Sequence, residues 1–90
     1  MVNLELYRVF YTVAKCGSLT KAAQALFISQ PAVSQSIKQL ENQLGITLFK
    51  RTYRGMVLSE VGEMMYVNVG KAITILDEAE NSLSNVKSEE

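Results

Sequence analysis

The 90-residue sequence predicts a mainly α-helical protein, in which three short helices and a β-hairpin precede one long helix. Apolar residues recur at three- and four-residue steps through most of the chain, which is the periodicity of amphipathic helices. One proline and five glycines are too few for a many-turned β-sandwich or a disordered linker. Only residues 46–59 gather β-branched and aromatic residues instead. At this length, we expect one small domain with an appendage.

The first two helices are predicted over residues 4–15 and 19–26. Gly17 ends the first, and Ser18 is a good N-cap for the second. The second helix turns Ala22 and Ala23 inward with Leu26, and paired alanines suit a close approach of two helix backbones. Only Phe27, Ile28 and Ser29 separate it from the next helical pattern. Two short helices joined by so few residues form a helix-turn-helix.

The third helix begins after Ser29, a good N-cap, and carries Pro31 in its first turn, where proline loses no hydrogen bond. Its two faces separate cleanly on a helical wheel, and Gly45 is a plausible stop. The apolar face consists of Val33, Ile37, Leu40 and Leu44, and the polar face of Gln30, Pro31, Ser34, Gln35 and Lys38.

Residues 46–59 predict a short hairpin with its tip at Tyr53-Arg54-Gly55. We expect four apolar side chains to anchor it to the core and three cations to face outward. The anchors are Leu48, Phe49, Val57 and Leu58, and the cations are Lys50, Arg51 and Arg54. Three helices followed by such a hairpin define a winged helix-turn-helix domain, which we place at residues 1–58.

Residues 59–90 predict a linker and dimerisation helix, capped by Ser59 and continuous to about Val86. Its apolar residues follow a heptad seam, and at ~1.5 Å per residue the helix is roughly 40 Å long, more than a domain of this size needs for its own core. We therefore expect the same helix of a second copy to cover the seam. This seam consists of Met65, Val69, Ala72, Leu76, Ala79, Leu83 and Val86.

Composition argues against catalysis. The chain has no histidine, one cysteine and no glycine-rich phosphate loop, so we expect neither an enzyme nor a metal or other cofactor. Cys16 reads as a small apolar residue, with a redox-sensing thiol as the alternative. The most apolar window, residues 64–76, is too short for a membrane span, and no secretory signal precedes it. These features predict a cytoplasmic protein with no membrane partner.

The zero net charge hides an asymmetry. Residues 1–59 carry seven cations and two carboxylates, a net charge of +5, whereas residues 60–90 carry two cations and seven carboxylates, a net charge of −5. An electrostatic footprint is local, so the basic part can meet phosphates while the acidic part points away.

The third helix and the hairpin together favour a double-stranded DNA partner. Amides such as Gln30 and Gln35 can pair with an adenine edge in the major groove, and the N-terminal part of a recognition helix is the part that meets bases. Cations on a wing bind phosphates, and an arginine at its tip can enter an A·T-rich minor groove. The alternative is a protein-interaction module, which would show little affinity for nucleic acid.

Residues 18–62 also resemble the N-terminal domain of bacterial LysR-type transcriptional regulators. The resemblance rests on the family patterns S-T-x-A-A, S-Q-P-A-V-S, L-E-x-x-L-G, L-F-x-R and L-T-x-x-G, here met in order within SLTKAAQALFISQPAVSQSIKQLENQLGITLFKRTYRGMVLSEVG. Two positions depart from it, because Gln35 stands where arginine is common and Ser59 replaces threonine. The first change hints at adenine or a water bridge in place of guanine, and the second keeps the cap.

The resemblance implies base-reading residues and backbone-contacting residues at matched positions. The base-reading set is Gln30, Pro31, Ser34, Gln35 and Arg54, and the backbone set is Ser18, Thr20, Lys21, Lys38 and Arg51, to which we add the cap Ser29. It further implies a homodimer with antiparallel linker helices on an interrupted inverted repeat. Family members continue into an effector-binding domain, so we expect the small-molecule effector to bind a domain absent from this chain, and the full-length protein to form a higher, nucleoid-associated oligomer.

Overall fold

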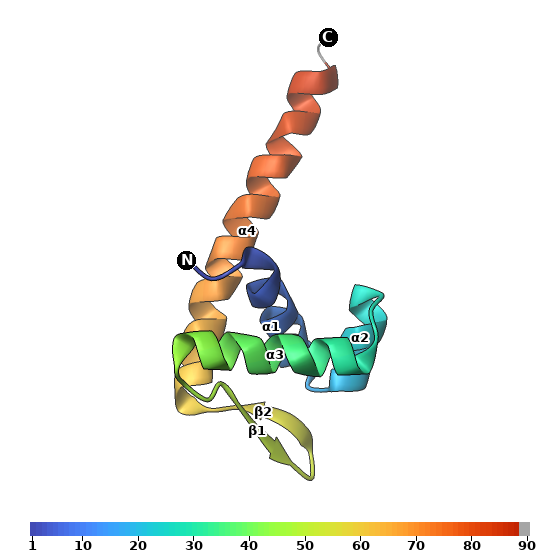
Figure 1. The fold of residues 1–90 in the computed structure, drawn as a ribbon. Helices are drawn as coiled ribbons and strands as arrows, with labels where there is room; N and C mark the ends of the chain where they lie inside the picture. The colour runs from blue at the N-terminus through green and yellow to red at the C-terminus, as the bar shows by residue number, and fades with distance from the viewer. Residues whose placement is uncertain (89–90) are drawn as a thin grey trace.

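The computed structural model describes residues 1–88, the last two by their backbone only. It confirms the predicted mainly α-helical fold, with a winged helix-turn-helix body from which one long helix projects (Figure 1). The elements are α1 (Leu4–Cys16), α2 (Leu19–Leu26), α3 (Gln30–Leu44), β1 (Phe49–Thr52), β2 (Gly55–Leu58) and α4 (Glu60–Ser88). Cys16 is the last residue of α1, half-buried and with a free thiol.

Serine side chains cap the helices as predicted. The hydroxyl of Ser18 accepts from the main-chain N–H of Lys21 at 3.2 Å, and that of Ser29 accepts from Ala32 at 3.2 Å. A helix leaves its first N–H groups without internal acceptors, so each cap fixes the residue at which the helix begins. Gln30 is therefore held as the first residue of α3.

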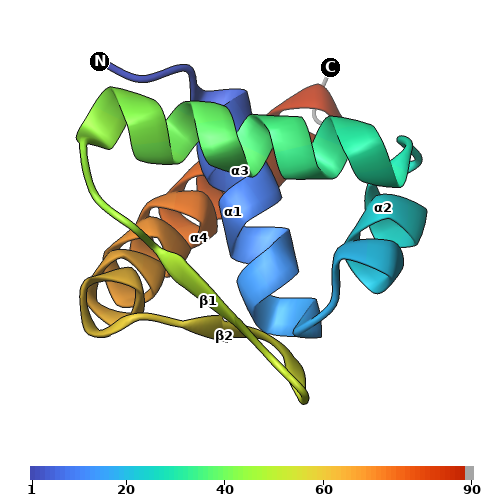
Figure 2. The same ribbon diagram turned by 60° about the horizontal axis from the view of Figure 1, so that its bottom comes forward.

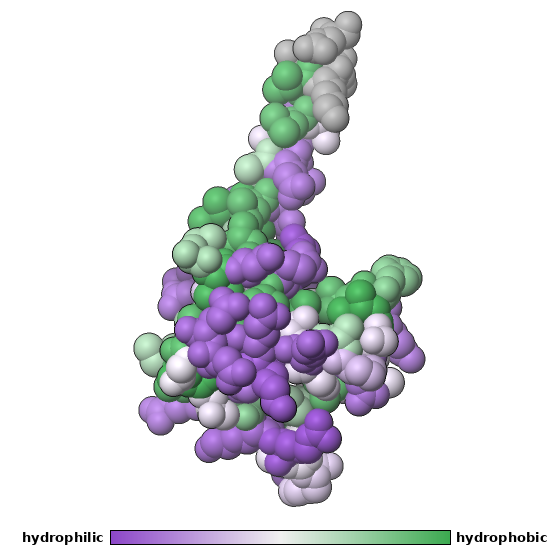
Figure 3. Space-filling model, viewed as in Figure 1, coloured by the Kyte–Doolittle hydropathy of each residue, from purple (hydrophilic) through white to green (hydrophobic). Residues whose placement is uncertain are grey.

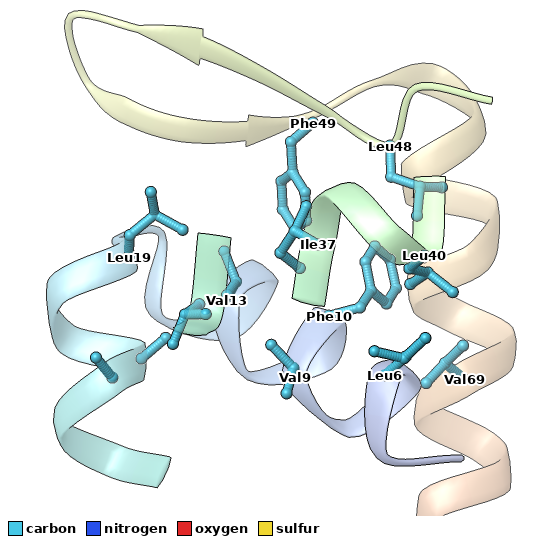
Figure 4. Packing of buried hydrophobic residues seen from close by; sticks show 13 residues of the cluster. Leu6, Val9, Phe10, Val13, Leu19, Ile37, Leu40, Leu48, Phe49 and Val69 are labelled. Carbon is cyan, nitrogen blue, oxygen red and sulfur yellow. The ribbon is translucent and has the colours of Figure 1, made fainter. Parts of the chain in front are cut away.

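The core lies where α1 crosses the other elements (Figure 4). Phe10 and Val13 of α1 are fully buried, and the ring of Phe10 lies 5.5 Å from that of Phe49. Ala22 and Ala23 are buried as predicted, where α2 packs closely on its neighbours. The buried side of α3 is formed by Val33, Ile37 and Leu40. Because these residues pack in the core, the opposite, polar side of α3 faces outward.

The hairpin is antiparallel, with Phe49 paired to Leu58 and Thr52 to Gly55, which confirms the predicted tip. The expectation that Val57 anchors it is wrong, because side chains alternate between the two faces of a strand. Val57 is 42% exposed, whereas the other predicted anchors, Leu48, Phe49 and Leu58, do pack in or against the core, joined by Met56.

The wing is also fastened to the loop that precedes α2. The main-chain N–H of Met56 donates to the Gly17 carbonyl at 3.3 Å. A Cβ at Gly55 would lie 2.7 Å from the same oxygen, and the φ of Gly55 is 109°, so both the close approach and the backbone conformation require glycine. This contact holds the wing beside the start of α2.

A cluster of hydrogen bonds joins α3, the wing and α4. The Glu41 carboxylate accepts from the main-chain N–H groups of Leu48 at 2.6 Å and Phe49 at 3.2 Å. Ser59 donates its N–H to the Leu48 carbonyl at 2.9 Å and its hydroxyl to the Thr47 carbonyl at 2.7 Å, while that hydroxyl accepts from Gly62 at 2.9 Å. The start of α4 is thus fixed to the body of the domain.

The proximal half of α4 packs on α1. Val69 belongs to the core, and the rings of Tyr11 and Tyr66 stack with centroids 5.0 Å apart. Burial, helped by the neighbouring Tyr11 hydroxyl, raises the pKa of Tyr66 above its ordinary value, so this hydroxyl stays uncharged at neutral pH. Beyond Ile73 the helix leaves the body, and Leu76 and Leu83 are 46% and 55% exposed. Within residues 1–88, no helix has both the length and the apolarity to cross a membrane.

Candidate nucleic-acid interface

Three separate elements contribute polar side chains to one open pocket of about 420 Å³. The pocket lies between the start of α2, the start of α3 and the wing. Figure 2 shows the ribbon of these three elements. We call the pocket the notch; it is lined by Gly17, Ser18, Leu19, Thr20, Gln30, Arg51, Thr52, Tyr53, Arg54, Gly55 and Met56.

The polar face of α3 is exposed as the sequence predicted. Gln30, Pro31, Ser34, Gln35 and Lys38 are all exposed, opposite the buried apolar face. Hydrophilic side chains gather over α3 and the wing tip in Figure 3. Gln30 lines the notch, whereas Ser34, Gln35 and Lys38 continue along the helix away from it. The face is long enough to follow several base edges rather than one.

Side chains from two different helices meet at the start of α3. The hydroxyl of Thr20, in the first turn of α2, donates to Oε1 of Gln30 at 3.3 Å. Both residues are exposed, so the hydrogen bond lies on the molecular surface. Sequence reasoning placed both residues at the interface without finding their contact, because no periodic pattern relates residues of different helices.

The wing tip pairs an arginine with an aromatic ring. Nε of Arg54 donates to the Tyr53 hydroxyl at 3.1 Å, and the guanidinium carbon lies 5.4 Å from the ring centroid. The main-chain N–H of Arg54 donates to the Thr52 hydroxyl at 3.1 Å, which orders the turn. Tyr53, 91% exposed, has no place in the predicted site. The signal in the sequence that could have pointed to Tyr53 is an aromatic residue next to a cation at a hairpin tip.

The wing cations do not share one face. Arg51 lines the notch with Ser18 and Thr20, but Lys50, the preceding residue of β1, does not. Adjacent residues of a strand point to opposite faces, which explains the difference. The structure thus brings Arg51 and Arg54 together with the starts of α2 and α3, and leaves Lys50 outside the group.

An apolar groove of about 430 Å³ lies on another side, between α1 and α4. We call the predicted heptad seam of α4 the α4 seam; the groove brings its proximal part next to the start of the chain, and Arg8 of α1 lies at the border of the groove. Hydrophobic side chains continue along the visible side of α4 above the body (Figure 3). The groove is lined by Met1, Leu4, Glu5, Tyr7, Arg8, Met65, Asn68, Val69, Ala72, Ile73 and Leu76.

The fold and the exposed polar helix define the winged helix-turn-helix class of DNA-binding domains. Residues 4–63 match the family described as "Bacterial regulatory helix-turn-helix protein, lysR family". The chain therefore belongs to the LysR family and is its helix-turn-helix DNA-binding domain. This family consists of transcriptional regulators, which confirms the expectation that the chain is not an enzyme.

Relatives agree with this assignment. The chain is 44% identical over 78 residues to the HTH-type transcriptional regulator BudR of Klebsiella aerogenes, covering 87% of this chain and 54% of the relative. It is 47% identical over 78 residues to the uncharacterized HTH-type transcriptional regulator YusT of Bacillus subtilis, covering 87% and 26%. The chain thus spans about half or less of these relatives. Its fold resembles the crystal structure of a complex of the BenM DNA-binding domain with catB site 1 DNA, with a TM-score of 0.88, 32% identity, and 97% and 98% of the two chains covered.

Proposed function

We propose that this domain reads double-stranded DNA, with α3 in a major groove and the wing at the adjacent minor groove. The observation that supports it best is the continuity of a polar helix face, whose single charge is Lys38, with a cation-bearing wing across the notch. Gln30, Pro31, Ser34 and Gln35 would meet base edges, and Arg54 would enter the minor groove. These roles follow the family pattern at matched positions, and the DNA complex of the BenM domain supports the general mode of binding.

Phosphate contacts would position the domain on the duplex. The first turn of α2 presents main-chain N–H groups and the positive end of a helix dipole toward the notch, where Arg51 adds a full charge. Cations on both sides of the reading face would then contact the phosphates of the two DNA strands. The proposed backbone set is Ser18, Thr20, Lys21, Ser29, Lys38 and Arg51.

A homodimer through α4 would place two such faces on an interrupted inverted repeat. The distal α4 seam is exposed, and the groove between α1 and α4 continues it. The distal half of α4 carries Asp77, Glu78 and Glu80, and the groove is lined by one cation, Arg8, and one carboxylate, Glu5. The complementarity of an antiparallel pair would therefore lie in the apolar surfaces of the seam and the groove rather than in charge. This complementarity supports the antiparallel arrangement that the family resemblance implies.

The whole protein would be a cytoplasmic, nucleoid-associated bacterial regulator. Its longer relatives support the proposal that an effector-binding region accompanies this domain. A small molecule bound there would act on the DNA-binding dimer through α4, and the complete protein would form a higher oligomer.

A contact with another protein is a second candidate, favoured by one observation. Phe27, in the turn between α2 and α3, is 94% exposed and adopts a positive φ of 58°. An exposed aromatic ring on a strained turn is the kind of anchor that protein interfaces use. It lies outside the α3 reading face, so the two functions are compatible.

Selection of bound duplexes from a random DNA library, repeated at 50 and 200 mM salt, tests the proposed function. We expect enrichment of an interrupted inverted repeat. If the dimer makes about 6–10 phosphate contacts, affinity will fall roughly 10³–10⁵-fold between the two salt concentrations. If no sequence is enriched and weak binding ignores salt, DNA reading is contradicted and the Phe27 surface becomes the principal candidate.

Two single variants separate base reading from phosphate binding. Gln30→Ala removes an amide from the start of α3, so we expect it to cost about 1–3 kcal/mol on the selected site and to relax preference at one base pair. Lys38→Ala removes one charge from the same face, so we expect weaker binding to all sequences and a salt slope lower by about one. Competition binding against a panel of singly substituted sites measures both. Unchanged preference in Gln30→Ala would exclude it from the reading face.

A further inference from the structure

Thr20 connects the second helix to the first residue of the recognition helix. Its hydroxyl donates to Oε1 of Gln30 at 3.3 Å, and both side chains line the notch. The caps Ser18 and Ser29 fix the residues at which α2 and α3 begin, so the two partners are carried by ordered backbone. The side chain of Gln30 is thereby held at its oxygen end before DNA arrives.

The orientation of the Gln30 amide decides which base edge it can read. A free glutamine pairs with adenine by accepting from N6 and donating to N7 at the same time. Here the oxygen accepts from Thr20, which occupies one of its two lone pairs and sets its direction, so both N–H groups of the NH₂ end stay unused by this contact. An NH₂ donor fits best an edge that presents two neighbouring acceptors, which are O6 and N7 of guanine. Adenine offers N7 as an acceptor, but its N6 amino group lies beside it and repels a second donor, and the N4 amino group of cytosine repels the donor outright.

We propose that Thr20 is a positioning residue that fixes Gln30 as a donor, so that Gln30 selects guanine rather than adenine. The inference rests on the proposed DNA-reading function and names the base class that this function would select. The single O–H of Thr20 is committed to Gln30, so any phosphate contact of Thr20 comes from its main-chain N–H in the first turn of α2.

The contact itself is tested without DNA. In a ¹H–¹⁵N spectrum of the free protein, Thr20→Val removes the hydroxyl at nearly constant shape, and we expect the Gln30 side-chain amide resonances to move toward those of a free, exposed glutamine. Thr20→Ser keeps the donor and is expected to leave them near their original positions. Unmoved resonances in Thr20→Val would show that the hydrogen bond is not formed and would overturn the proposal.

The consequence for specificity is tested with the duplex library. The base pair read by Gln30 is the one at which Gln30→Ala loses preference, and wild-type protein is expected to select a G·C pair over an A·T pair there. Loss of one hydrogen bond of ordinary strength should reduce that preference roughly 2–10-fold in Thr20→Val, with more adenine recovered, and Thr20→Ser should restore it. Thermal unfolding followed by circular dichroism verifies that each variant is folded.

The possible failures are distinguishable. Selection of adenine by the wild-type protein at that position would overturn the donor orientation while leaving DNA reading intact. If Thr20→Val weakened binding to all sequences by one factor, with the salt slope unchanged because threonine is uncharged, Thr20 would be a phosphate contact and the positioning role would be wrong. Absence of any enriched sequence would overturn the proposed function and this inference together.

Discussion

Replacement of Gly62 by alanine is expected to destabilise the domain by about 2–3 kcal/mol. Gly62 is buried in the first turn of α4, and a Cβ there would collide with the backbone oxygen of Leu48. Relief requires α4 to move away from the strand connection, which strains the hydrogen bond between Ser59 and Leu48. Overpacking of this kind costs about 3 kcal/mol or more, offset by the roughly 1 kcal/mol that alanine gains over glycine in a helix.

Gly70→Ala is the matched control, because it makes the same change two turns further along α4. The three atoms nearest to its Cβ would all belong to the Tyr11 side chain, the nearest being Cε1 at 3.1 Å, and a ring can shift where a backbone cannot. We expect a change in the free energy of unfolding within about 0.5–1 kcal/mol, of either sign. Urea unfolding at one protomer concentration measures both variants. Equal stability of the two would contradict the assigned role of the Gly62 contact.

Two glutamates in the distal α4 seam are expected to abolish dimerisation. Leu76 and Leu83 are about half exposed in the protomer, so Leu76→Glu with Leu83→Glu should leave the fold intact. In the proposed dimer they would place charges in an apolar interface that already carries acidic side chains. Because two linked half-sites bind with an effective concentration near the millimolar range, loss of the dimer should lower affinity for the inverted repeat roughly 10²–10⁴-fold.

The seam variant is tested by measuring its oligomeric state and its affinity for a single half-site. Analytical ultracentrifugation should give a monomer for the double variant, and its affinity for a single half-site should equal that of a wild-type protomer. Val67→Glu adds a charge at a residue 55% exposed on the opposite side of α4, and it should leave the dimer unchanged. A double variant that remained dimeric would place the interface elsewhere.

Much of the fold could be predicted because its signals are local. Helical spacing, the serine caps and the glycine stops each depend on a few neighbouring residues, and the structure confirms the predicted elements. Val57 was assigned wrongly because the apolar run at residues 56–58 does not show which strand face is buried. That choice depends on where the whole hairpin packs, through the Met56 contact with Gly17 and the ring of Phe49.

The α4 seam also shows that a local sequence pattern does not reveal which apolar residues are buried. A heptad pattern treats all its positions alike, but Val69 is buried in the core of its own domain while Leu76 and Leu83 remain exposed. Sequence spacing identifies the stripe without showing which part of it is already covered. The Thr20 contact with Gln30 and the Tyr53 contact with Arg54 were beyond prediction for a related reason, since each depends on side-chain orientation.

Because the junction at Ser59 and Gly62 is fixed, α4 is a rigid extension of the domain rather than a flexible connection. Because hydrogen bonds fix its start to the body of the domain, a change in the angle at which two α4 helices cross in the proposed dimer would move the two DNA-binding domains as rigid bodies. Over a helix of roughly 40 Å, a rotation of about 5° displaces the far end by ~3.5 Å, close to the ~3.4 Å rise of one base pair. A tilt of a few degrees is therefore enough to change the register of the two half-sites.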